Sequence, residues 1–405
     1  MVKEKWISTH IKDIATIYGR IGFRGYTKQD IVKPGFGAIS LSPSNIKDGK
    51  VTYAPATYIS WEKYEESPEI KLSDGDVVLV KTGSTFGKTA YIDRLPWPTT
   101  LNPQIVVFKK LKIHAKLFAY FMASKNIQEQ ISSVIVGGAI PTLSQEQVYA
   151  FDIVYPPDAK EQAAIAEALS DVDNLISSLQ KLIKKKKAIK QGAMQELLTG
   201  KKRLPGFSGE WKKYKVGEIG VVVTGSTPPR SNRNLWGGNF PWVSARDFIG
   251  KYISSSYEHV TSEGKNYCRI LPAESVLVTC IASIGLNGIA AIPLATNQQI
   301  NAIVCNNDFY NEIVYYSLVY NKEKLKLMAG QTAVPIISKQ QFEEFEILLP
   351  RNVLEQKAIA KVLSDMDCEI EQLEKKLAKY QQIKQGMMQE LLTGRIRLKE
   401  GENNA

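Results

Sequence analysis

Two long segments of the chain repeat an apolar residue at alternating steps of four and three positions. Such spacing is typical of the seam of a coiled coil, so each segment is predicted to form a long helix. Gly200 and Gly394 follow the two segments and are typical of residues that end a helix. The seam positions are Ile165, Leu169, Val172, Ile176, Leu179 and Ile183 in the first segment and Ile359, Leu363, Met366, Ile370, Leu373 and Leu377 in the second.

The two helical segments are copies of one another. Residues 161–204 and 355–398 are identical at 26 of 44 positions with a constant offset of 194 residues, which chance does not produce. Both copies open with Glu-Gln-x-Ala-Ile-Ala and close with Met-Gln-Glu-Leu-Leu-Thr-Gly. Fainter matches, such as Asn102-x-Gln104-Ile105 with Asn297-x-Gln299-Ile300, extend the duplication into the flanking regions.

The regions beside the helices are predicted to be mixed, strand-rich modules. Short apolar runs at 76–80 and 105–108, and at 275–279 and 300–304, are typical of buried strands, and short helices are expected near 115–123 and 310–320. The predicted fold class is therefore α+β, with two strand-rich modules separated by two long helices. The predicted domains are module A1 (1–157), a central helix (158–204), module A2 (205–351) and a C-terminal helix (352–405).

Two matching helices in one chain can pair with each other. We expect an antiparallel coiled coil, which would relate A1 and A2 by a pseudo-twofold axis. The alternative is that each helix packs on its own module.

Composition favours a polyanionic partner and excludes some classes of protein. The 405 residues carry a formal net charge of +11, which favours nucleic acid. No apolar stretch is long enough to cross a membrane, and the N-terminal residues do not resemble a secretory signal. The four cysteines and three histidines are scattered, so we expect no zinc site and a cytoplasmic location.

No catalytic constellation stands out. The segment Gly83–Thr89 resembles a phosphate-binding loop but has one residue too few between its glycines, and Tyr91–Pro96 cannot open the helix that must follow. Asp171 and Asp173, repeated as Asp365 and Asp367, are predicted to lie on solvated helix surfaces rather than in an acid–base pair. We therefore expect a non-catalytic chain that binds no cofactor.

Loops that combine glycine with basic and aromatic residues suit DNA. Arginine can bind guanine through two hydrogen bonds, asparagine can bind adenine, and glycine allows close approach of the backbone. Such loops also occur on ordinary protein surfaces, so this pattern alone leaves both interpretations open. The candidate DNA contacts are Arg20, Arg24, Tyr26, Lys28, Lys81, Ser84, Thr85 and Lys88 in A1 and Arg230, Arg233, Asn234, Trp236, Trp242 and Arg246 in A2.

The helical repeats, the divergent modules and the A2 stretch from Gly225-Ser226-Thr227-Pro228 to Trp236-Gly237-Gly238 together resemble specificity subunits of type I restriction–modification systems. The resemblance covers essentially the whole chain. In A1, residues Tyr18–Tyr26 lack the Thr-Pro and Trp-Gly-Gly elements, so the resemblance says less about the DNA contacts of that module.

The resemblance implies a DNA-recognition subunit without enzymatic activity of its own. Each module would be a target recognition domain for one half of a split double-stranded DNA sequence, and the paired helices would fix the gap. Two modification subunits would bind S-adenosylmethionine and methylate adenine, and restriction subunits with ATP and Mg²⁺ would complete the nuclease. The alternatives are a solitary DNA-binding decoy or regulator and a protein-interaction scaffold; DNA binding that weakens steeply with salt would exclude the scaffold.

By the same resemblance, the closing motif of each helix is a candidate for partner docking. The alternative is that these residues only pair the two helices. They are Gln191, Gly192, Gln195 and Glu196, with Gln385, Gly386, Gln389 and Glu390 in the second copy.

Overall fold

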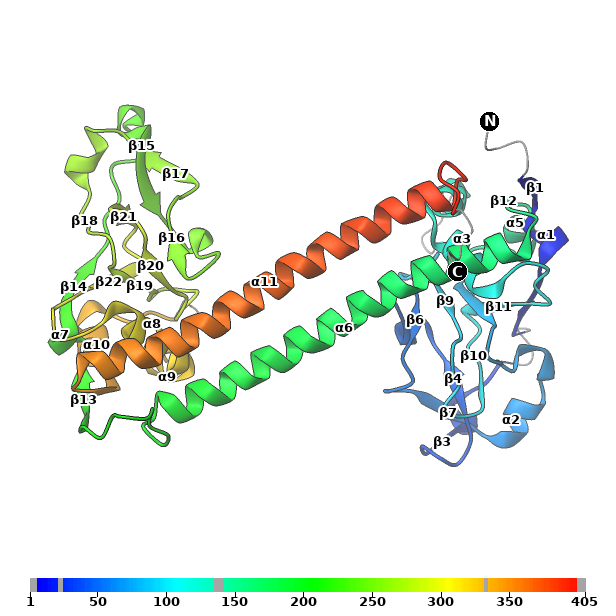
Figure 1. The fold of residues 1–405 in the computed structure, drawn as a ribbon, viewed down its shortest axis with the longest axis horizontal. Coiled ribbons are helices and arrows are strands. Elements are labelled where there is room, and N and C mark those ends of the chain that lie inside the picture. The colour runs from blue at the N-terminus through cyan, green and yellow to red at the C-terminus, as the bar shows by residue number, and fades with distance from the viewer. Residues whose placement is uncertain (1–5, 21–24, 135–141, 331–333, 399–405) are drawn as a thin grey trace, which may run out of the picture. The chain divides into compact units, whose positions relative to one another are not determined.

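The computed structural model describes residues 6–20, 25–134, 142–330 and 334–398. By its internal contacts the chain divides into unit 1, residues Met1–Leu179 with Lys376–Ala405, and unit 2, residues Gln180–Lys375. Each unit contains one module, one part of helix α6 (Ala159–Leu197) and one part of helix α11 (Val353–Leu391) (Figure 1). No described helix is long and apolar enough to cross a membrane.

Module A1 is built on two four-stranded sheets, with strand orders β2–β11–β8–β9 and β10–β4–β7–β3, and on the short ladders β1–β12 and β5–β6. Its strands are β1 (Ile7–His10), β2 (Thr16–Gly19), β3 (Ile31–Val32), β4 (Ala38–Leu41), β5 (Ile46–Lys47), β6 (Lys50–Val51), β7 (Thr57–Ile59), β8 (Val77–Val80), β9 (Thr89–Tyr91), β10 (Thr99–Leu101), β11 (Ile105–Lys109) and β12 (Asp152–Tyr155). Its helices are α1 (Ile11–Ile14), α2 (Trp61–Glu65), α3 (Ala115–Ala123), α4 (Lys125–Ser133) and α5 (Gln145–Tyr149), with 3₁₀ turns η3 (Lys28–Asp30), η4 (Pro43–Asn45) and η5 (Pro68–Ile70).

Module A2 has the corresponding sheets β14–β22–β19–β20–β16 and β17–β15–β21–β18, and the ladder β13–β23. Its strands are β13 (Trp211–Lys215), β14 (Gly220–Thr224), β15 (Trp236–Val243), β16 (Tyr252–Ile253), β17 (Glu258–Val260), β18 (Ile270–Leu271), β19 (Val276–Thr279), β20 (Asn287–Ala290), β21 (Leu294–Thr296), β22 (Ile300–Cys305) and β23 (Glu346–Pro350). Its helices are α7 (Val216–Ile219), α8 (Asn311–Tyr320), α9 (Lys322–Met328) and α10 (Lys339–Glu343), with 3₁₀ turns η6 (Arg233–Leu235), η7 (Ala245–Asp247) and η8 (Gly264–Tyr267).

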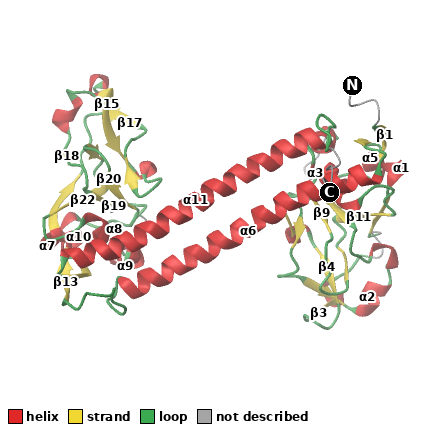
Figure 2. Cartoon of the chain, in the orientation of Figure 1, coloured by secondary structure: helices red, strands yellow, loops and turns green. Residues whose placement is uncertain are grey.

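The two modules share the topology of their central strands, and the central sheet of A2 has a fifth strand, β16. In A1, β11 lies antiparallel between β2 and β8, and β4 pairs in parallel with β10. In A2, β22 lies antiparallel between β14 and β19, and β15 pairs in parallel with β21. The α+β fold class predicted from the sequence is confirmed, and strands and helices are mixed in both modules (Figure 2).

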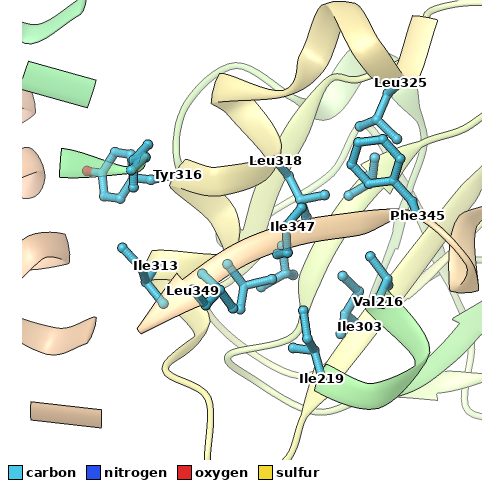
Figure 3. Close-up of a cluster of buried hydrophobic side chains, with 14 of the residues drawn as sticks. Val216, Ile219, Ile303, Ile313, Tyr316, Leu318, Leu325, Phe345, Ile347 and Leu349 are labelled. Carbon is cyan, nitrogen blue, oxygen red and sulfur yellow. The ribbon is translucent and has the colours of Figure 1, made fainter. Parts of the chain in front are cut away.

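The predicted strands are apolar at consecutive positions because helices cover one face of the central sheet and the second sheet covers the other. In β8, Val77 and Leu79 face the core under the helices, whereas Val78 and Val80 face the second sheet. In unit 2 the helix-facing core also includes Leu197 of α6 and Ile359 of α11. Figure 3 shows part of that core.

The long helices pack both on the modules and on each other. Ile165 and Leu169 lie in the A1 core and Ile359 and Leu363 in the A2 core, so the ends of the predicted seams are held by modules. Ion pairs join the helices directly, Asp173 to Lys384 at 2.7 Å in unit 1 and Glu369 to Lys186 at 2.5 Å in unit 2. In each unit the helices run antiparallel, as expected.

The glutamate of the Glu-Gln pair at the start of each helical repeat connects the two long helices of its unit. Buried Glu355 accepts two hydrogen bonds from Arg203, which follows α6, at 2.6 and 2.8 Å, and Glu161 accepts two from Arg397, which follows α11, at 2.9 and 2.5 Å. We call these two ion pairs the latches. Each latch joins the start of one long helix to the segment that follows the other.

The neighbouring glutamines attach the helices to their modules. Gln162 donates to the Pro156 carbonyl and accepts from the His114 backbone N–H, and Gln356 does the same with Pro350 and Tyr310. Both N–H groups lie at the first turn of a module helix, where intrahelical acceptors are missing. The repeated Glu-Gln therefore has a structural role in both units.

Glycine is required where each repeat closes. Gly200 and Gly394 have φ values of +69° and +67°, which favour glycine, and a Cβ atom would lie 3.3 Å from the Trp211 ring and 3.1 Å from the Trp6 ring respectively. The predicted helix ends therefore also pack against Trp211 of β13 and against Trp6, the residue before β1.

The prediction for the helix surface is confirmed for Asp171 and Asp365, which are exposed, and was wrong for Asp173 and Asp367, which are half-buried. Asp173 accepts from the Tyr120 hydroxyl at 2.8 Å and pairs with Lys384, and Asp367 accepts from Tyr316 at 2.7 Å and pairs with Lys190. Burial and these hydrogen bonds raise the pKa of both tyrosines. Each aspartate joins a module helix to both long helices.

Replacing Glu355 with alanine should destabilise unit 2 by about 3 kcal/mol, because it leaves the Arg203 guanidinium largely buried without its carboxylate. Glu369→Ala breaks the more exposed pair with Lys186 and should cost less than about 1 kcal/mol. Urea denaturation monitored by tryptophan fluorescence measures both. Equal losses of stability would contradict the role given to the latch.

Candidate nucleic-acid interface

The connection between β14 and β15 in A2 carries three of the candidate DNA contacts, Arg230, Arg233 and Asn234, and aromatic rings pack against it. The Arg230 guanidinium lies 3.8 Å from the centroid of the Trp236 ring and 4.9 Å from that of Trp242. The two rings meet edge to face, with centroids 5.0 Å apart. The connection is therefore held in one conformation by stacking.

Trp242 supports this surface rather than forming it. Its side chain is 3% exposed and its indole N–H donates to the Ser226 carbonyl at 2.9 Å. The prediction that Trp242 contacts DNA is corrected, because a buried ring in β15 has no free face. Trp236 is half-buried and keeps part of its ring accessible.

An acidic residue lies within this basic surface. Glu258, at the start of β17, accepts from both terminal nitrogens of Arg230, at 2.5 and 3.1 Å, and pairs with Arg246 at 3.0 Å. The hydrogen bond from Arg230 lowers the pKa of Glu258, and the same bond raises the pKa of Arg230. Sequence reasoning missed Glu258 because Arg230 is distant from it along the chain.

Arg233 and Asn234 are the accessible polar tips of the same surface. Both are exposed in η6, and neither side chain has a hydrogen-bond or ion-pair partner among the described residues. The backbone beneath them is fixed, because the Asn232 side chain accepts from the Asn234 N–H and Thr261 donates to the Asn234 carbonyl. An arginine and an asparagine presented on a rigid turn can both donate to base edges.

Further basic and aromatic residues contact the β14–β15 connection or its neighbours and were not predicted. Lys265 lies 4.4 Å from the Phe240 ring centroid, and Arg269 donates to the Thr224 carbonyl at 2.8 Å. Tyr257, whose ring centroid lies 5.1 Å from the Arg246 guanidinium, and Tyr267, whose carbonyl accepts from the Ser226 hydroxyl, are exposed. Their spacing in the sequence gives no periodic pattern, so only these contacts relate them to the candidate residues.

In A1 the structure changes the list of candidates. Arg20 is 4% exposed and donates to the Leu101 carbonyl at 3.0 Å and to the Thr100 hydroxyl at 3.3 Å, so its predicted DNA contact is corrected to a structural role. Arg24 lies outside the described residues. Tyr26 is half-buried beside Arg20, and Lys28 is exposed in η3.

The order of the elements along the chain relates Lys28 in A1 to Arg233 and Asn234 in A2. The connection after β2 contains η3, just as the connection after β14 contains η6. Lys28 in η3 and Arg233 in η6 thus occupy corresponding 3₁₀ turns. This correspondence favours Lys28 over the other A1 candidates.

The candidates Lys81, Ser84, Thr85 and Lys88 lie in the turn of the β8–β9 hairpin. Val80 and Lys88 are joined by a backbone hydrogen bond of 2.8 Å, and a strand follows the turn where a phosphate loop requires a helix. Ser84 and Lys88 are exposed, and Lys81 and Thr85 are half-buried. The described residues contain no group of three or more His, Cys, Asp or Glu side chains that could hold a metal ion.

An exposed aromatic group in A1 was missed. Trp61 and Trp97, with ring centroids 6.3 Å apart, and Phe36, which is 72% exposed, lie in or beside the sheet that contains β4. The sequence feature that could have indicated this group is the run of three aromatic residues and one lysine between positions 58 and 64.

The glutamines of the closing motifs face solvent, whereas the leucines of the same motifs are buried in the module cores. Gln191, Gln195, Gln385 and Gln389 are exposed, and their side chains have no hydrogen-bond partner among the described residues. Among the described residues, Glu196 and Glu390 form ion pairs with nearby Lys202 and Arg395. In unit 1, Gln385 and Gln389 line a groove of about 720 Å³ together with α4 and β12. This arrangement argues against the alternative that the glutamines pair the two helices.

Comparisons with known proteins agree with one another. The family described as "Type I restriction modification DNA specificity domain" matches residues 3–191 and 208–385. The type I restriction enzyme MjaVIII specificity subunit of Methanocaldococcus jannaschii is 25% identical over 356 residues, covering 82% of this chain and 81% of its own.

Two solved structures share the fold. The type I restriction–modification system S subunit from M. genitalium has a TM-score of 0.64 at 17% identity and covers 95% of this chain and 96% of its own. A chain from a study of complex assembly and conformational transition of the type I system has a TM-score of 0.57 at 15% identity, with coverage of 96% and 98%.

Replacing Arg20 with alanine should destabilise unit 1 by about 1–3 kcal/mol, because the buried Leu101 carbonyl and Thr100 hydroxyl lose their donor. The control Lys28→Ala changes an exposed side chain and should alter stability by less than about 0.5 kcal/mol. Urea denaturation measures both. If Arg20→Ala unfolds at the same urea concentration as Lys28→Ala, Arg20 has no structural role.

Proposed function

The chain belongs to the type I restriction–modification DNA specificity family, and from this premise we propose that A1 and A2 each recognise one half of a split double-stranded DNA sequence. The role in DNA sequence recognition follows from the family. The assignment of one half-site to each module rests on the duplication: two copies of one topology carry different loops. The observation that carries it is the rigid, basic A2 surface that presents Arg233 and Asn234 without partners among the described residues.

Specificity subunits are non-catalytic as a family, and we propose that chemistry in the complex belongs to other subunits. Two modification subunits would bind S-adenosylmethionine and methylate adenine, and restriction subunits would use ATP and Mg²⁺. We assign no cofactor to this chain. The complex would act on DNA in the cytoplasm.

The exposed glutamines of the closing motifs are the proposed docking positions for the modification subunits. Gln191 and Gln195 in unit 2 repeat Gln385 and Gln389 in unit 1. Two equivalent sites on one chain fit two identical partners. The divergent modules and the similar helices then follow from two different half-sites and one kind of partner.

Methylation mapping tests this function. The chain would be co-expressed with its genomic neighbours, and methylated adenines would be mapped across the host DNA by single-molecule sequencing. A split motif with a fixed gap, absent when this chain is deleted, is expected. A stable complex that binds DNA without producing a motif would favour the decoy, and a complex without DNA binding would favour the scaffold.

Replacing Arg233 and Asn234 with alanine should relax the half-site recognised by A2 and leave the other half-site unchanged. Each lost pair of hydrogen bonds to a base should reduce discrimination by about 1–3 kcal/mol. Methylation mapping with the double variant measures the base preference at every position. Relaxation in both halves, or in neither, would contradict the assignment.

Inserting four residues into both long helices should widen the gap and leave both half-sites unchanged. Because the two antiparallel helices lie side by side, the insertions lengthen the pair by about 6 Å, which corresponds to about one to two base pairs of DNA. The same mapping measures the gap. A changed half-site with an unchanged gap would refute the proposal that the helices set the spacing.

A further inference from the structure

The acidic residue within the A2 basic surface has no role in the proposed function as stated so far. Glu258 is the first residue of β17 and is paired in register with Trp242 of β15. Its carbonyl also accepts from the Ser256 hydroxyl at 2.5 Å. The carboxylate therefore projects from a fixed strand, whereas Arg230 lies in a loop and Arg246 in a short 3₁₀ turn.

The contacts of Glu258 order two long side chains. An arginine side chain loses rotamer entropy when it is fixed. Glu258 binds both terminal nitrogens of Arg230, Trp236 covers one face of that guanidinium, and Arg246 shares the same carboxylate while lying 5.1 Å from the Tyr257 ring centroid. Part of this entropy is thus lost before any ligand binds.

The two guanidinium groups keep unused donors. An arginine has five N–H groups, and Glu258 accepts from two nitrogens of Arg230 and pairs with one of Arg246. Both arginine side chains are about half exposed, at 52% and 54%. One carboxylate and two guanidinium groups leave this cluster with a net positive charge.

We propose that Glu258 is a positioning residue for DNA recognition by A2, holding Arg230 and Arg246 so that their remaining N–H groups meet the DNA in one orientation. The inference rests on the proposed function of A2. It adds a specificity determinant that itself repels the ligand, since a carboxylate beside DNA phosphates is electrostatically unfavourable. The benefit is discrimination between sequences, because rigid donors fit one arrangement of acceptors.

A positioning role and a purely electrostatic role of Glu258 predict opposite changes in affinity for the target duplex. If Glu258 were an ordinary surface anion, Glu258→Gln would raise affinity for every duplex by removing repulsion. If Glu258 positions the arginines, the same substitution raises affinity for unrelated DNA but lowers affinity for the target. The ratio of the two affinities separates the two accounts.

The experiment uses the assembled complex and two duplexes, one with the mapped target and one with its A2 half-site scrambled. Glu258→Gln should reduce the ratio of affinities at least tenfold. Glu258→Asp keeps the charge but shortens the side chain by one methylene, so it should reduce the ratio in the same direction without a change of net charge. Glu210→Gln, which breaks the exposed pair of Glu210 with Arg351 in the same unit, is the matched control and should leave the ratio unchanged.

The outcomes distinguish this inference from the function on which it rests. A wild-type complex that binds both duplexes equally would overturn the proposed function and the inference with it. A wild-type complex with a clear preference, together with an unchanged ratio in Glu258→Asp and Glu258→Gln, would overturn the inference alone. Correct folding of each variant is checked by its melting temperature, and the half-site preference is a readout that stability alone does not move.

Discussion

The latches between the long helices are the interaction on which each unit depends. In unit 2, Glu355 is 1% exposed and is neutralised by Arg203, a residue that lies after the other long helix. A buried carboxylate is tolerated only with such a partner, so the start of α11 can be buried in the module core only when the end of α6 is beside it. Unit 1 repeats the same dependence with Glu161 and Arg397. The closing glycines and the glutamines at Gln162 and Gln356 extend this joint, which explains why the opening and closing motifs of the repeats have stayed alike.

The same arrangement of latch, closing glycine and glutamine supports two modules that have diverged. The central strands and their register correspond in A1 and A2, whereas the connections after β2 and β14, each of 11 residues, differ in sequence and in aromatic content. Side chains within the sheets are constrained by cores on both faces. The exposed side chains on the connections make few contacts, and those of Arg233 and Asn234 have no hydrogen-bond or ion-pair partner among the described residues. A conserved scaffold with variable connections is an arrangement in which new DNA sequences can be recognised without altering the joint.

The elements with strong local patterns could be predicted from the sequence, and the side chains with distant partners could not. The seam from Ile165 to Ile183, the strands around Val78 and Leu277 and the helix near Phe118 follow from apolar spacing alone. Arg20 was predicted to contact DNA because the composition of its loop suits DNA. Its partners lie in β10, about 80 residues away along the chain. Asp173 was placed in solvent because its own helix offers no partner; Tyr120 and Lys384 come from other segments. Glu258 was missed for the same reason. In each case burial or pairing depends on contacts that only the fold creates.

The central claim is that each module contacts its own half of one DNA target. Photo-crosslinking tests it directly: a benzoylphenylalanine is placed at Lys28 in A1 or at Arg233 in A2, and the assembled complex is irradiated on its mapped target duplex. The account predicts that position 28 crosslinks to bases in one half-site only and position 233 to bases in the other only. Crosslinks from both positions to the same half-site would contradict it.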